Sequence, residues 1–167
     1  MQSLQFPDVK DFMAKLLATD PFDAFLLSEA SITTFTTFHI DGSFHKDYFG
    51  TAEAEKEHLT DAAFPSWKMI RPFFFDLVKG KHTPLQFKII FRLADYNVEK
   101  LLKQSGIDLQ VQDVSGLFLN IHYNGKEVSC TTGTSLRIFT LDKSLDHAWD
   151  AMVQKFLRQK QIPFLTI

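Results

Sequence analysis

Residues 117–132 read LFLNIHYNGKEVSCTT, and this stretch decides the fold class. Its centre, Asn124-Gly125, is the strongest short-range signal for a two-residue hairpin turn. On both sides of this turn apolar and polar residues alternate, as they do in strands with one buried face. We therefore expect an antiparallel hairpin with strands at 117–123 and 126–132.

The hairpin register predicts the surroundings of the only cysteine. A loop at Asn124-Gly125 pairs Leu119 with Cys130 and His122 with Glu127. Cys130 then lies on the apolar face, where a thiol stays protonated and inert, so we interpret it as a core residue and not as a nucleophile. A single cysteine also excludes an internal disulfide and a cysteine zinc cluster, which fits a reducing compartment.

Helical spacing of apolar residues predicts four helices, at 9–17, 67–77, 98–102 and 145–157. Pro72 predicts that the second helix is kinked or starts late, near Arg71. We expect Asn97 to cap the third helix, and Asp142 or Ser144 to cap the fourth.

Alternating patterns predict further strands at 25–29, 32–40, 43–48, 85–93 and 136–141. Asp41-Gly42 is the predicted turn before the strand at 43–48. The stretch 50–63 is expected to be a long acidic loop, either without regular structure or with one helical turn. The element order is then β-α-β-β-β-α, followed by the same order again. This order predicts an α+β fold, with a largely antiparallel sheet covered by helices.

The repeated order suggests an internal duplication within a single domain, 1–167, with pseudo-repeat halves at about 1–80 and 81–167. Trp67 and Phe74 recur as Trp149 and Phe156, each 82 residues later. Repeated β-α-β-β-β units are also similar to those of DNA sliding clamps, whose helices line a ring around DNA. That resemblance is architectural, and it makes a clamp-like or nucleic-acid-associated protein the alternative function.

Composition narrows the class of protein. With 167 residues, 45% of them hydrophobic and 18 of them Phe, the chain can build a core without a disulfide or a metal. It has no phosphate-binding glycine loop and no H-E-x-x-H, C-x-x-C or G-x-S-x-G motif, so we predict no catalytic residue, no metal site and no cofactor. The N-terminus lacks the layout of a signal peptide and no apolar run could span a membrane, so we expect a cytoplasmic protein without a membrane partner.

Charge is unevenly distributed, although the net charge is only −2. Residues 41–63 hold six acidic and two basic residues, whereas 66–92 hold six basic residues and one acidic residue. Two solvated faces would explain this pattern, and so would a basic binding surface beside an acidic loop. The candidate anion-binding residues are Arg71, Lys79, Lys81, Lys88 and Arg92.

The predicted hairpin at Asp41-Gly42 also yields a candidate interaction face. Its register places His39 and His45 on opposite faces, which argues against a shared metal ion. The same register places Phe35, His39, Phe44 and Tyr48 together on the outer face. Either the acidic loop or a second layer covers them, or they form a surface for a protein partner or for self-association.

Four segments carry a resemblance to a known family: 29–35 (EASITTF), 79–88 (KGKHTPLQFK), 130–136 (CTTGTSL) and 139–145 (FTLDKSL), the last leading to Trp149-Asp150. Together they resemble a bacterial family catalogued only as a domain of unknown function, over nearly the whole chain. The resemblance implies a bacterial intracellular origin and assigns no catalytic residue. We therefore expect a non-enzymatic protein-interaction or scaffold module.

Overall fold

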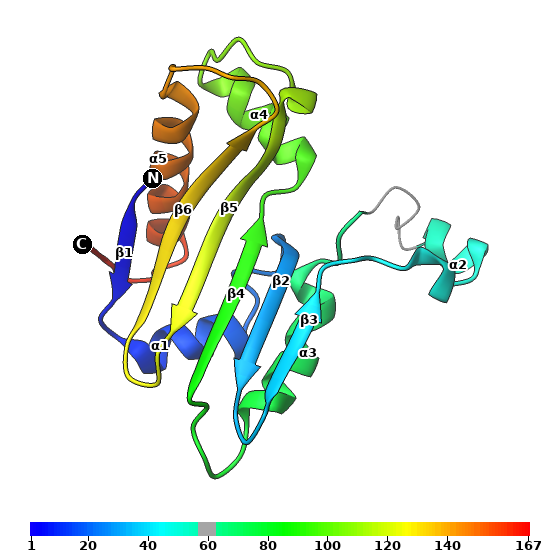
Figure 1. The fold of residues 1–167 in the computed structure, drawn as a ribbon, viewed down its shortest axis with the longest axis vertical. Coiled ribbons are helices and arrows are strands. Elements are labelled where there is room, and N and C mark those ends of the chain that lie inside the picture. Colours follow the sequence, from blue (N-terminus) through cyan, green and yellow to red (C-terminus); the bar gives the residue numbers. More distant parts are fainter. Residues whose placement is uncertain (57–62) are drawn as a thin grey trace.

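A seven-stranded antiparallel sheet runs through the molecule in the order β3-β2-β4-β5-β6-β1-β7 (Figure 1). The structure is a computed structural model that describes residues 1–56 and 63–167. An antiparallel sheet with separate helices confirms the predicted α+β class. The strands are β1 (Ser3–Phe6), β2 (Leu26–Thr33), β3 (Thr37–Asp41), β4 (Gln86–Arg92), β5 (Val114–Tyr123), β6 (Val128–Leu136) and β7 (Leu165–Thr166).

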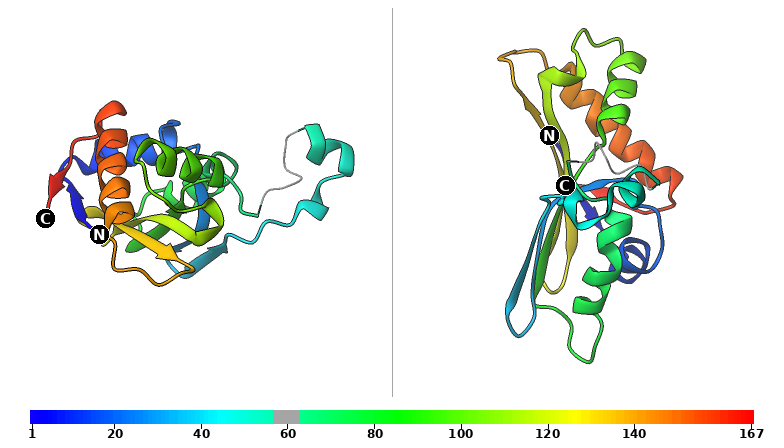
Figure 2. Two further views of the ribbon diagram at one scale, coloured as in Figure 1. Left: turned by 90° about the horizontal axis from the view of Figure 1, so that it is seen from above. Right: turned by 90° about the vertical axis from the view of Figure 1, so that its right-hand side faces the viewer.

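The helices gather on one face of this sheet, which is plain when the sheet is viewed along its edge (Figure 2). Helix α1 (Val9–Met13) continues as a π-helical turn at Ala14–Ala18, and short 3-10 turns occur at Lys46–Tyr48 and Val111–Asp113. The other helices are α2 (Thr51–Lys56), α3 (Trp67–Val78), α4 (Asp95–Gln104) and α5 (Ser144–Gln159). Of these, α2 stands away from the sheet.

The core fills the space between the sheet and the helices. Phe22 and Phe25 pack against Phe91 of β4 and Phe156 of α5, with ring centroids 5.2–5.7 Å apart. Two buried tryptophans tie helices to distant backbone, because the indole N–H of Trp67 donates to Leu16 O and that of Trp149 donates to Phe118 O, each at 2.9 Å. The large rings thus bury apolar area while their polar atoms stay bonded.

The opposite face of the sheet is mostly polar, and no described helix lies on it (Figure 2). One row of cross-strand neighbours crosses all seven strands; its members are His39, Ser31, Lys88, His122, Ser129, Gln5 and Leu165. Antiparallel sheets commonly bury one face and leave the other in water. The second covering layer considered for this face is therefore absent from the described part of the chain.

The hairpin predicted at Asn124-Gly125 forms, but its register differs by two residues. Asn124 N donates to Glu127 O at 3.1 Å, and the Asn124 Oδ1 atom accepts from the backbone of Lys126 and Glu127. Asn124 therefore opens the turn, as asparagine does when its side chain bonds the backbone two residues on, and Gly125, with φ of 93°, is its first central residue.

This shift changes the predicted partners but keeps their faces. Cys130 pairs with Ile121 and not with Leu119, and His122 pairs with Ser129 and not with Glu127. Because a shift of two residues preserves the alternation of side chains, Cys130 is still on the core face.

Three predicted strands are wrong. The segment 32–40 contains a turn at 34–36, so it forms the end of β2 and most of β3, and β6 ends at Leu136, so 136–141 is mostly loop. After β3 the Asp41 carboxylate accepts a hydrogen bond from Ser43 N at 2.9 Å, and the chain turns out of the sheet instead of forming a strand at 43–48.

In each half, only two of the three strands predicted between the first helix and the last one form, so the predicted β-α-β-β-β-α order is not reproduced in the described residues. Trp67 is the first residue of α3, whereas Trp149 lies in the second turn of α5, so these two residues do not occupy equivalent positions. The internal duplication and the clamp-like topology are therefore not confirmed.

The helix starts agree with the prediction in part. Helix α3 begins at Trp67, the predicted residue, with Ser66 accepting from Met69 N, so the alternative of a late start near Arg71 does not occur. Pro72 lies inside this helix. Asn97 lies within α4, whose N-cap is Ala94, because the helix begins at Asp95. Helix α5 begins at Ser144, one residue before the predicted start, and its N-cap is Lys143 and not Asp142 or Ser144. The Asp142 carboxylate nevertheless accepts from Ser144 N at 2.9 Å.

The point where the chain leaves the sheet can be tested at Gly42. A Cβ atom at this position would lie 2.2 Å from Ser28 O and 2.3 Å from Leu27 O, both backbone atoms of β2. We expect Gly42→Ala to lower the free energy of unfolding by about 1–3 kcal/mol in urea denaturation, because backbone atoms must move to admit the methyl group. Gly50→Ala is the matched control, since its Cβ meets nothing within 4 Å. Equal stability of the two variants would contradict this close approach.

Candidate functional site

The predicted aromatic face is split into two parts. Phe35 lies in the turn between β2 and β3 with 92% of its surface exposed, and its ring meets Phe38 edge-on at 5.9 Å. His39 is exposed on the polar face of the sheet. Phe44 and Tyr48 lie beyond Gly42, in the segment that leaves the sheet. The four residues do not share one strand face, because the hairpin that would have aligned them does not form.

Phe44 and Tyr48 instead join a cluster beside α3. Their rings lie 6.0 Å and 5.3 Å from that of Phe49. These three residues border a hollow of about 370 Å³ whose other wall is α3; its lining also includes Met69, Ile70 and Phe73 of α3, together with Asp41, Ser43, His45 and Pro65. We call this the aromatic hollow.

The aromatic hollow is bounded by a segment that projects from the body of the molecule. Residues 42–56, which we call the arm, extend sideways from the end of β3 and end in α2 (Figures 1 and 2). In α2 only Ala54 is buried. Tyr48 is 86% exposed on the arm, and Phe73 is 67% exposed on α3. The hollow therefore presents large rings to solvent.

The five candidate anion-binding residues are not brought to one place. Arg71 of α3 donates to both carboxylate oxygens of Asp23, at 2.8 and 2.9 Å, and this hydrogen bonding raises the pKa of the guanidinium. Lys79 pairs with Asp76 at 3.0 Å. Lys81 follows in the exposed loop, at the far end of α3. These three residues lie on or just after α3.

Lys88 and Arg92 belong to the opposite, polar face of β4. Lys88 is exposed in the cross-strand row, while Arg92 is half-buried and donates to Ser115 O at 2.8 Å. The Arg92 guanidinium lies 4.1 Å from the ring centre of Phe64, and burial lowers its pKa. Arg71 and Arg92 are therefore already bound by other residues of the chain. The sheet separates Lys88 and Arg92 from the other three candidate residues.

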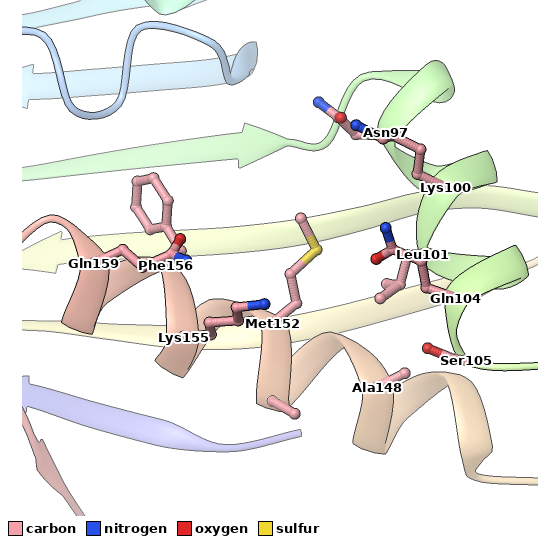
Figure 3. Close-up of a pocket in the computed structure, with 11 residues that line it drawn as sticks. Asn97, Lys100, Leu101, Gln104, Ser105, Ala148, Met152, Lys155, Phe156 and Gln159 are labelled. Carbon is pink, nitrogen blue, oxygen red and sulfur yellow. The ribbon is translucent and has the colours of Figure 1, made fainter.

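A groove between α4 and α5 was missed by the sequence analysis. It has a volume of about 410 Å³ and is lined by side chains of both helices. Figure 3 shows Leu101 of α4 and Met152 and Phe156 of α5 projecting into the space between them. Lys100 and Lys155 line the same space, and the remaining lining residues are Asn97, Gln104, Ser105, Ala148, Ala151 and Gln159.

A smaller cavity of about 120 Å³ adjoins this groove, since both are lined by Asn97, Met152 and Phe156. Its own walls include Phe25, Leu93, Trp149 and Val153. The sequence shows each helix as amphipathic, but helical periodicity does not show which two helices lie side by side. The groove therefore becomes visible only in the folded chain.

Cys130 is buried between its neighbours Leu4 on β1 and Ile121 on β5. Burial raises the pKa of its thiol to about 12, so the nucleophilic thiolate is not available near neutral pH. Across residues 1–56 and 63–167, no group of three or more His, Cys, Asp or Glu side chains is placed to hold a metal ion. Residues 57–62, part of the long acidic loop expected at 50–63, lie outside the described residues.

Comparison with known proteins identifies the family. A family model matches residues 15–165, which is most of the chain. The chain belongs to DUF5721, a family of unknown function. No curated protein and no solved structure matches it. Membership in DUF5721 assigns chemistry to no residue, and within the described residues no helix has the length and apolarity to cross a membrane.

The environment of Cys130 predicts its reactivity. Because its pKa is about 12, almost none of the thiol is ionised at pH 8. We expect a thiol reagent such as Ellman's reagent to leave Cys130 unmodified in the native protein and to modify it fully in urea. Rapid modification of the native protein would show that β6 opens readily, contrary to this structure.

Proposed function

We propose that this member of DUF5721 is a non-enzymatic interaction module that self-associates through its aromatic hollow and arm. The observation that carries the proposal is the pair of solvent-facing rings, Tyr48 and Phe73, on opposite walls of the hollow. Aromatic side chains dominate the binding energy of protein interfaces, because each buries a large area with little loss of conformational freedom.

Packing within one chain does not account for these exposed rings. Tyr48 and Phe49 contact each other, and Phe44 contacts Phe49, yet Tyr48 and Phe73 keep most of their surface in water. Apolar surface gathered in one place favours contact with another surface. A two-fold dimer that placed one hollow against the other would bury Tyr48 and Phe73 of both copies.

Charge favours a second copy of the chain as the partner. Residues 41–56 carry four acidic residues (Asp41, Asp47, Glu53 and Glu55) and two basic ones (Lys46 and Lys56), so this segment is net negative. Helix α3 and its following loop expose Lys68, Lys79 and Lys81, of which Lys79 pairs with Asp76. A dimer about the hollow would bring the acidic arm of one copy toward the basic surface of the other. Such complementary charges direct association and make it sensitive to salt.

The test is the molar mass of the protein, measured by light scattering after size exclusion over a wide concentration range. We expect the wild type to dimerise, and more weakly as the NaCl concentration rises. The variant Tyr48→Ser/Phe73→Ser should weaken dimerisation by about 30-fold or more, since loss of an interface anchor costs about 2 kcal/mol.

The matched control is Tyr96→Ser/Phe139→Ser, which removes two exposed rings elsewhere on the surface. This control should dimerise like the wild type. A wild type that stays monomeric at every concentration would overturn self-association, and equal loss in both double variants would remove the aromatic hollow as the interface.

A further inference from the structure

We propose that the groove between α4 and α5 binds a small amphipathic anion, specifically a carboxylate that carries an apolar chain. This site is separate from the aromatic hollow, with which it shares no lining residue. The inference rests on three features of the groove: its unpaired cations, its apolar floor and the adjoining inner cavity.

The charge of the groove is positive and uncompensated. Lys100 on α4 and Lys155 on α5 both line it, and neither forms an ion pair with a described residue. By contrast, Lys103 on the same helix α4 pairs with Glu99 at 3.1 Å. No Asp or Glu lines the groove. An anion bound in the groove would therefore lie near positive charge that no described acidic residue compensates.

Neutral polar groups also line the groove. Asn97, Gln104 and Ser105 come from the α4 side, and Gln159 comes from α5. Amide N–H and hydroxyl groups donate hydrogen bonds to a carboxylate, and a lysine ammonium supplies three further donors. Figure 3 shows Asn97, Gln104 and Ser105 on the α4 side of the groove and Lys155 and Gln159 on α5. Both helices thus contribute hydrogen-bond donors to the groove.

The remainder of the groove suits an apolar chain. Its floor is formed by Leu101, Ala148, Met152 and Phe156, and beyond Met152 and Phe156 lies the inner cavity lined by Phe25 and Trp149. Methionine is flexible and fills irregular spaces, so Met152 can change rotamer to admit a chain. The volume of about 410 Å³ lies in the range of small-molecule sites, which favours a small ligand over a folded partner.

The test uses decanoate as the probe, titrated into the protein by calorimetry and by tryptophan fluorescence. We expect saturable binding and a change in emission, because Trp149 lines the inner cavity. Acetate, which has the head group without the chain, should bind much more weakly. Decyltrimethylammonium, which has the same chain with the opposite charge, should also bind much more weakly.

Two double variants test whether decanoate binding depends on the two lysines of the groove or weakens with the loss of any two positive charges. Lys100→Gln/Lys155→Gln should bind decanoate about tenfold more weakly than the wild type, as expected for the loss of two partly exposed charge contacts. Lys103→Gln/Lys160→Gln removes two other lysines from α4 and the end of α5, and should bind like the wild type. Thermal unfolding measurements should show that both variants are folded.

Three outcomes would overturn the proposal: no saturable decanoate binding, equal binding of the cationic probe, or equal weakening in both lysine variants. The variant Tyr48→Ser/Phe73→Ser should bind decanoate normally, since the aromatic hollow is separate. Failure of the groove proposal therefore leaves the self-association proposal standing, and failure of self-association leaves the groove proposal standing.

Discussion

Burial of only one sheet face is the constraint on which the rest of the structure depends. Each long strand directs its apolar side chains toward the helices and most of its polar side chains toward water. A strand therefore cannot shift by one residue without moving its apolar side chains to the solvent face. The indole N–H groups of Trp67 and Trp149 reinforce this arrangement, because each bonds a carbonyl oxygen on a distant element. The helical layer is thereby held to one side (Figure 2).

Both candidate sites follow from that one-sided layer. Helices α4 and α5 pack their apolar faces mainly against the sheet. The groove that remains between the two helices is lined by residues that include Lys100, Met152 and Lys155. The arm arises where β3 ends, because Gly42 packs against the backbone of β2 and the chain then leaves the sheet. Its aromatic residues reach only α3, so the aromatic hollow stays open to solvent.

The sequence predicts what is local and periodic, and fails where distant elements must meet. The hairpin at Asn124-Gly125, the buried face of Cys130 and the α+β class are confirmed, because turn chemistry and alternation determine them. The strand at 43–48 is wrong, since alternation alone does not show that a segment has a neighbour to pair with. The basic residues of 66–92 lie close together in the sequence, which predicts one candidate anion-binding set. In the fold, the sheet lies between Arg71 and Lys88, and Arg71 forms an ion pair with Asp23. The groove has no signal in either helix alone.

The central claim is that a second copy of the chain covers the arm and the aromatic hollow. Hydrogen–deuterium exchange of residues 42–56, followed by mass spectrometry at rising protein concentration, tests it most directly. The account predicts that amide protection in the arm and in α3 increases with concentration, while protection in β4 and β5 stays constant. Exchange in the arm that is independent of concentration would contradict the account.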